Sequence, residues 1–211
     1  MAIFNSYLLG KARKSVGNIT LCYRNMKNIA QAKVFSRRDN PTPEILEQRA
    51  RMKVLVQLGR RLLVVVRKGF VGIGKGTTSN AFVALNMGAV SVDGSMVGTV
   101  EYTRLKVASG ILDVPKVTVS CIPEGNSYSF SQDGEEETEE GLCSAEDRVY
   151  AVFIEEATSK VKLLQLKNRG EGGISSFTLP DGWGTEGIHV YCFAVSKNGK
   201  MASDSVYQTV E

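Results

Sequence analysis

The chain has few of the residues from which common active sites are built. Its 211 residues include one histidine, His189, one tryptophan, and four cysteines without a CxxC pair. Neighbouring residues cannot assemble a zinc site of the usual Cys/His kind, and His189 has no Ser or Asp partner in a recognisable motif. We therefore expect a protein that is not an enzyme and that holds no metal and no cofactor.

Long apolar runs are absent as well. No stretch approaches the ~18 uninterrupted apolar residues of a membrane-spanning helix, so we expect no membrane contact. The amino-terminal charges follow a short apolar patch, which is the reverse of the order in a secretory signal. A content of 43% apolar and 23% charged residues excludes a disordered or collagen-like chain. We expect a globular protein that is used without export through a cleaved leader.

The cysteines leave one question open. Cys121 and Cys192 lie 71 residues apart on two predicted strands, close to the spacing of an immunoglobulin core disulfide. Immunoglobulin domains place a Tyr two residues before the second Cys, whereas this chain has Val190 there. Free buried thiols are also the commoner state in a protein without an export signal. The sequence alone does not decide whether the pair is bonded.

Charge is divided unevenly along the chain. Residues 1–80 carry sixteen Lys/Arg against three Asp/Glu, a net charge of +13, and residues 81–211 carry ten against nineteen, a net charge of −9. Such a chain can bind nucleic acid or phosphate through its basic half, or copies of it can associate head to tail. A solvated basic face is a third interpretation. Only Tyr23 and Phe35 offer stacking groups between residues 11 and 68, so nucleic acid is possible but not expected.

Local patterns in the first 96 residues predict a hairpin and two helices. Two runs of β-type residues, 16–23 and 28–35, predict a hairpin that is too small to be stable alone. Thr42 and Pro43 suit the cap and the first position of a helix, which we expect to run to about Lys68. The run LLVVV (62–66) would also suit a buried strand. A shorter helix is expected at 79–90, after a glycine-rich connection.

After residue 94 the pattern becomes that of short strands separated by Pro and Gly, which is typical of an antiparallel immunoglobulin-like sandwich. The β-type runs are 100–107, 116–123, 149–156, 160–166, 174–179, 187–196 and 205–210. Asn198-Gly199 predicts a type I′ hairpin turn, and the acidic run 133–140 predicts a solvated loop rather than a calcium site. The expected fold class is α+β: an amino-terminal β-hairpin and helices (domain 1–96), followed by an all-β immunoglobulin-like sandwich (domain 97–211).

One motif suggests a nucleotide. Gly69, Gly72, Gly74, Lys75 and Thr77 fit the GxxGxGKGT variant of the phosphate-binding loop. That loop requires a preceding strand in a parallel sheet, whereas here a capped helix precedes it and antiparallel strands follow. A flexible connection between the two helices is the favoured interpretation.

Five segments together resemble a known protein family. They are Gly10…Ser15-Val16-Gly17-Asn18-Ile19, TPEILEQRARM (42–52), Ser79-Asn80-Ala81-Phe82-Val83, VEYTRLKVASGIL (100–112) and HVYCFAVSKNGKMASDSVY (189–207). With them the chain resembles a family that is widespread in Bacteroidetes genomes and has relatives among the structural proteins of crAss-like bacteriophages. The resemblance implies an α+β amino-terminal region, an immunoglobulin-like sandwich and no enzymatic activity. In the phage relatives it implies a virion component, most simply a ring around the neck or tail.

Sequence and resemblance together lead to a functional hypothesis. We expect a non-enzymatic structural virion protein that is synthesised in the cytoplasm of the host bacterium, forms a homo-oligomeric ring in the neck or tail, and contacts portal and tail-hub proteins. The expected contact residues are basic: Lys33, Arg37, Arg38, Arg49, Arg51, Arg60 and Arg61. The alternatives are a bacterial interaction module of the same family, and a nucleic-acid- or nucleotide-binding protein that uses the basic half.

Overall fold

The computed structural model describes residues 2–5, 8, 10–36, 39–73, 76–122, 126–137, 142–184 and 186–209. These residues form three α-helices and thirteen strands in four antiparallel sheets, which confirms the predicted α+β fold class. Contacts divide the chain into two compact units, Met1–Thr42 (unit 1) and Pro43–Glu211 (unit 2). The predicted domain boundary after residue 96 falls inside unit 2.

Unit 1 is a four-stranded antiparallel sheet. Its strands are β1 (Ala2–Phe4), β2 (Lys14–Val16), β3 (Ile19–Arg24) and β4 (Lys27–Ala32), in the order β1-β4-β3-β2. The predicted hairpin is β3–β4, and its two-residue turn, Asn25-Met26, has φ angles of 49° and 61°. Positive φ at both positions is typical of a type I′ turn, whose twist matches that of the paired strands. β1 and β2 are not among the predicted strands because each has only three residues.

Unit 2 begins with helices α1 (Pro43–Arg61), α2 (Leu63–Gly69) and α3 (Thr78–Asn86). The predicted helix over 43–68 is therefore confirmed in position, with a break at Leu62. The ambiguous run 62–66 is helical, because Leu62, Val65 and Val66 are buried together at helical spacing. α3 ends before the predicted limit at residue 90, since a 3-10 turn (Met87–Ala89) follows it.

The remaining strands are β5 (Val90–Val92), β6 (Gly98–Val100), β7 (Val117–Ile122), β8 (Ser127–Gln132), β9 (Arg148–Glu155), β10 (Val161–Asn168), β11 (Gly173–Thr178), β12 (Ile188–Val195) and β13 (Val206–Gln208). They form sheets in the orders β10-β9-β12-β13, β11-β8-β7 and β5-β6. The predicted strand 100–107 is wrong: a 3-10 turn, Tyr102–Arg104, follows β6, and Leu105 and Val107 are buried among helical residues. β8 is absent from the prediction.

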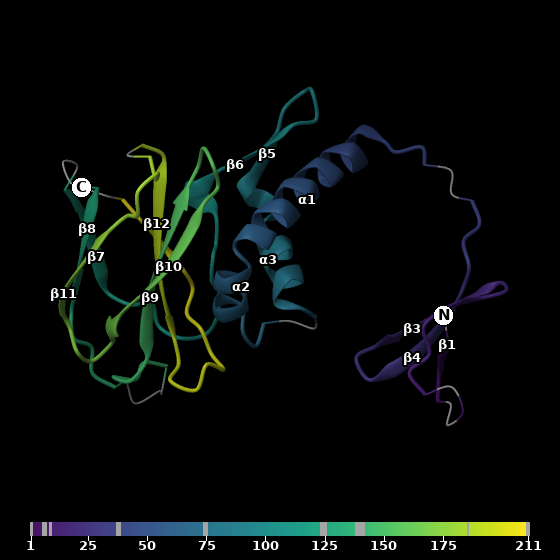
Figure 1. Cartoon of the computed structure of the whole chain (residues 1–211), viewed down its shortest axis with the longest axis horizontal. Coiled ribbons are helices and arrows are strands. Elements are labelled where there is room, and N and C mark those ends of the chain that lie inside the picture. Colours follow the sequence, from purple (N-terminus) through teal and green to yellow (C-terminus); the bar gives the residue numbers. More distant parts are fainter. Residues whose placement is uncertain are drawn as a thin grey trace. The chain divides into compact units, whose positions relative to one another are not determined.

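Strands β9 and β12 are buried on both faces and join three layers. Successive side chains of a strand point to opposite faces. Val152 of β9 therefore packs in the core cluster that contains the helices, whereas Phe153 packs in the cluster between the two sheets. Within unit 2, Figure 1 shows the helices on one side of the β10-β9-β12-β13 sheet and strands β7, β8 and β11 on the other. The predicted sandwich of short antiparallel strands is present; its immunoglobulin-like character stays a prediction.

The structure shows the state of the cysteine pair and the conformation of the Asn198-Gly199 turn. Cys121 and Cys192 are both free, and burial raises the pKa of the Cys192 thiol to about 12. The hairpin at Asn198-Gly199 is present, because the Ser196 N–H donates to the Met201 carbonyl at 3.0 Å. Only Gly199 of that pair has a positive φ, 69°, so the predicted type I′ turn is wrong there.

Candidate functional site

The glycine-rich connection between α2 and α3 has structural roles at both described ends. Gly69 ends α2, and a Cβ there would lie 2.6 Å from the Cβ of Ala108. Gly72 has a φ of 77°, a conformation that favours glycine. A helix precedes this connection where a phosphate-binding loop requires a strand.

Thr77 closes the connection as the cap of α3. Its Oγ1 accepts a hydrogen bond from the Asn80 N–H at 3.3 Å, which satisfies one of the first N–H groups of the helix. Gly74 and Lys75 lie outside the described residues. The described part of the motif is therefore explained by packing and capping.

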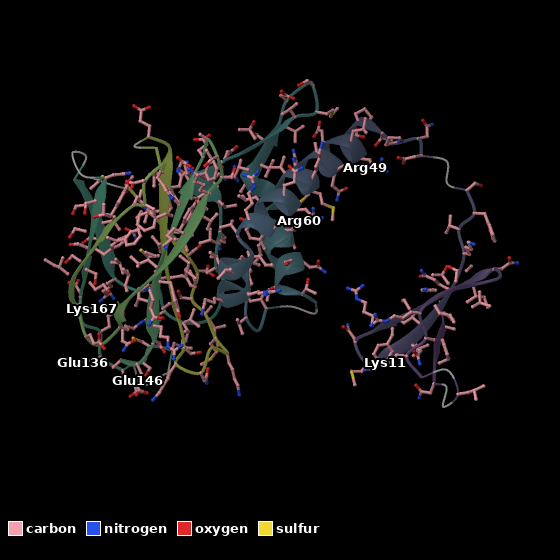
Figure 2. The ribbon with its side chains drawn as sticks, in the orientation of Figure 1. Lys11, Arg49, Arg60, Glu136, Glu146 and Lys167 are labelled. Atoms are coloured by element: carbon pink, nitrogen blue, oxygen red, sulfur yellow. The ribbon has the colours of Figure 1, made fainter. Side chains whose placement is uncertain are left out.

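The predicted basic contact residues that the structure describes lie on α1, apart from Lys33. Arg61 Nη1 donates to the carbonyl oxygen of Thr158 at 2.8 Å, and Arg51 forms an ion pair of 3.6 Å with Glu47. Both side chains therefore make contacts within unit 2. Figure 2 labels Arg49 and Arg60, which lie at two points along α1 and line the surface hollows described next.

The other three predicted residues precede α1 and belong to unit 1, and one of them, Lys33, is among the described residues. Lys33 lies over the ring of Phe35, with Nζ 5.3 Å from the ring centroid. Arg37 and Arg38 lie outside the described residues. Lys33 therefore belongs to unit 1, whereas the predicted contact residues on α1 belong to unit 2.

A groove of about 630 Å³ lies between α1 and α3. Its lining is mostly apolar and comprises Gln48, Met52, Leu55, Val56, Gly59, Arg60, Leu63, Ser79, Asn80, Val83, Ala84 and Met87. A second hollow of about 410 Å³ adjoins it and shares Met52, Val56 and Arg60. Met52, which lines both hollows, is 53% exposed. We name these two hollows together the α1 groove.

Unit 1 has an uncovered apolar face. The strand register places Val16 beside Ile19, and Ile19 beside Ala32, so these side chains share a face. The same face carries Leu21, and alternation adds Phe4, Tyr23, Ala2 and Ala30, together with two polar residues, Lys14 and Asn28. Val16 is 70% exposed and Ile19 is 49% exposed. Among the described residues of unit 1, no helix and no second sheet covers this face.

One end of that face is partly closed by the loop between β1 and β2. Asn28 Nδ2 donates to the Gly10 carbonyl at 2.9 Å, and its Oδ1 accepts from the Ala12 N–H at 3.1 Å. Asn28 and Ala12 are the two buried residues among those described in unit 1. The sheet thus has a local clamp and very little core.

His189 has a structural environment. Its ring stacks on Tyr102 with centroids 4.1 Å apart, Nδ1 lies 3.2 Å from the hydroxyl of Tyr207, and Nε2 lies 3.6 Å from Glu156 Oε2. Burial lowers the pKa of His189, and the carboxylate of Glu156 opposes that shift. The ring is enclosed between aromatic side chains, as expected for a strand histidine.

The acidic run is only partly a solvated loop. Glu135 forms an ion pair of 3.6 Å with the fully buried Arg169 and accepts a hydrogen bond from the Lys116 N–H at 2.9 Å. A buried guanidinium needs such a counter-ion. Glu136 and Glu137 are exposed, and residues 138–140 lie outside the described residues. No sequence signal pointed to Arg169, because its partner is 34 residues away.

Comparison with protein-family models, with curated proteins and with solved structures found no match to this chain. Within the described ranges, no group of three or more His, Cys, Asp and Glu side chains is placed to hold a metal ion. No helix of the described chain is long and apolar enough to cross a bilayer. The surfaces that stand out are therefore the apolar face of unit 1 and the α1 groove.

Proposed function

We propose that this protein is a non-enzymatic structural protein of a tailed, crAss-like bacteriophage. Many copies form a ring in the neck or tail that links the portal, the tail and peripheral proteins. The observation that carries the proposal is the uncovered apolar face of unit 1, because it requires a covering surface. The resemblance described above supplies the virion location.

A sheet with one apolar face is stable only when another layer covers that face. Ala12 is the one buried apolar residue among those described in unit 1, while Val16 and Ile19 of this face are exposed. Each fully buried aliphatic side chain contributes about 1.5–3 kcal/mol, so covering this face is worth several times the energy of any surface ion pair. A neighbouring copy offers such a surface in every ring position.

Net charge favours a head-to-tail arrangement. Unit 1 holds eight Lys/Arg and one Asp/Glu, a net charge of +7, and unit 2 holds eighteen and twenty-one, a net charge of −3. Unit 1 of one copy is therefore attracted to unit 2 of the next. Such a heterologous contact repeats from copy to copy and closes into a ring when the rotation permits. Charge sets orientation and association rate, and apolar burial supplies the affinity.

The test is the mass in solution at low and moderate salt, measured by light scattering, with negative-stain images of the same peak. We expect a discrete large oligomer or rings for the full chain and a monomer for a chain that lacks residues 1–42. A 23.0 kDa monomer of the full chain under every condition would contradict self-assembly. Intact rings from the shortened chain would remove the role of unit 1.

A bacterial interaction module of the same family would make the same contacts outside a virion. The genes beside that of this protein separate the two possibilities: portal and tail genes support the virion, and their absence supports the bacterial module.

The charge of unit 1 also favours a second candidate, nucleic-acid binding. Lys11 lies over the ring of Tyr23, with Nζ 5.4 Å from the centroid, so a cation and a stacking group are adjacent. This function predicts binding of a labelled single-stranded oligonucleotide that weakens steeply between 50 and 300 mM salt. If the protein does not bind the oligonucleotide, and if nuclease treatment does not change its assembly, nucleic-acid binding is excluded and the structural function is the one that remains.

A further inference from the structure

The α1 groove has the ridge and the hollows of a helix-packing surface. Met52, Val56 and Arg60 are spaced four residues apart and form a ridge along α1, and a hollow lies on each side of that ridge. Helices pack by placing such a ridge into the groove of the partner helix and receiving the partner's ridges in return. The ridge from Met52 to Arg60 spans about 12 Å, at 1.5 Å per residue.

The apolar floor of this surface is complete on the α3 side as well. Val83 and Met87 line the groove opposite Met52, and Leu63 closes one end of it. Apolar side chains on two neighbouring helices form the kind of hydrophobic groove into which an amphipathic helix lays its apolar face. A third helix would bury the exposed part of Met52.

The charge around the groove selects the partner. Arg49, Lys53 and Arg60 line its two hollows, and no Asp or Glu is among the described residues that line them. An amphipathic helix with acidic residues beside its apolar face would be matched to this rim, and a basic helix would be repelled.

The described helices of this chain do not have that charge. α1 has five basic and two acidic residues, α2 has Arg67 and Lys68, and α3 has no charged residue. Unit 1, with its net charge of +7, is disfavoured for the same reason. The occupant therefore comes from another protein.

We propose that the α1 groove binds an amphipathic helix of a different protein, through a face of large aliphatic side chains flanked by Asp and Glu. This goes beyond the proposed function, which concerns contacts between copies of the chain. The groove would attach a second component, while unit 1 joins the copies.

The experiment uses the full chain and two fluorescein-labelled synthetic peptides of 18 residues. Both have the same leucine face at helical spacing; one has Glu on its flanks and the other has Lys. Fluorescence anisotropy at 50 mM salt measures binding. We expect the Glu peptide to bind at least tenfold more tightly than the Lys peptide. Equal binding of the two peptides, or no binding of either, would overturn the proposal.

Three variants locate the binding. Met52→Asp should weaken the Glu peptide at least tenfold, and Arg60→Glu should reduce or invert the preference between the peptides. The matched control is Val64→Asp, because Val64 is 63% exposed on α2 but does not line the groove. Its effect should be less than twofold. If Val64→Asp weakens binding as much as Met52→Asp does, the groove is not the site.

Two other occupants have their own readouts. Displacement of the Glu peptide by a twelve-carbon fatty acid at micromolar concentration would show a lipid site and overturn the proposal. A solution mass that halves in Met52→Asp would show that a second copy fills the groove, and this too would overturn it. Rings that persist in Met52→Asp while peptide binding is lost would support the proposal and separate it from self-assembly.

Discussion

Gly69 illustrates how single residues in this chain are fixed by packing. A Cβ at this position would lie 2.6 Å from the Cβ of Ala108 and 2.7 Å from the carbonyl oxygen of Val107, so backbone would have to move. We expect Gly69→Ala to lower the free energy of unfolding by about 1–3 kcal/mol. Urea denaturation measures it. Gly88→Ala is the control, because no atom lies within 4 Å of a Cβ there. Equal effects of the two substitutions would contradict the packing role.

His189 gives the chain one pH-dependent group near neutrality. The unfolded state binds a proton at the ordinary histidine pKa of about 6.5, whereas burial lowers the pKa in the folded state. The unfolded state therefore binds more protons, and the free energy of unfolding falls as the pH decreases through 6.5.

His189→Gln should remove this slope between pH 7.5 and 5.5, as measured by urea denaturation at each pH. The single imidazole can also be titrated directly by NMR. A wild-type protein that becomes more stable on acidification in this window would show that attraction to Glu156 outweighs burial.

The elements that could be predicted are those with a strong local signal. The start of α1 follows from Thr42 and Pro43, and β9 and β12 are long β-type runs that the sheet buries on both faces. The length of α1 can also be predicted. Leu55 and Leu62 are buried, whereas Met52 belongs to a second stripe that is exposed. A sequence shows apolar spacing and does not show which stripe lacks a partner.

The elements that were missed have a physical reason too. β8 buries Tyr128, Phe130 and Gln132 on one face and has serine at the alternate positions, so its apolar content is low although its period is that of a strand. The run 100–107 has the opposite property. It is rich in β-type residues, but only Val100 pairs with another strand, while Leu105 and Val107 pack in the core cluster that contains the helices.

The cap of α3 gives a test at the scale of an element. Thr77→Ala removes the acceptor for the Asn80 N–H and should destabilise unit 2 by about 1 kcal/mol, measured by thermal or urea unfolding. Thr77→Ser keeps the acceptor and should stay close to the wild-type value. A wild-type chain that binds Mg²⁺-ATP, and loses binding in Thr77→Ala, would instead restore the phosphate-loop interpretation.

On the scale of the whole molecule, the fold class could be predicted from the sequence, whereas the α1 groove and the uncovered face of unit 1 could not. A basic run shows how much charge a helix carries, but the partners of each charge follow from the fold: Arg51 contacts Glu47, and Arg61 contacts Thr158, a residue 97 positions away. The orientation of these side chains depends on the rotation of α1 about its own axis. That rotation is fixed by Leu55, Leu58 and Leu62, which pack in a core cluster whose other members lie far along the chain.

Substitutions on the uncovered face of unit 1 can separate the assembly of copies from the folding of unit 2. Val16 and Ile19 are adjacent on the uncovered face of unit 1, and Val16→Asp with Ile19→Asp places two carboxylates where the neighbouring copy should pack. Burying each charge costs several kcal/mol, so the oligomer should dissociate to a monomer in light scattering. Unit 2 is a separate compact unit, and the midpoint of its thermal unfolding should change by no more than about 1 °C, which corresponds to ~0.3 kcal/mol. The control is Val97→Asp, at a position 59% exposed in the loop between β5 and β6, which should leave the mass unchanged. An oligomer that survives the double substitution would place the contact between copies elsewhere than on unit 1.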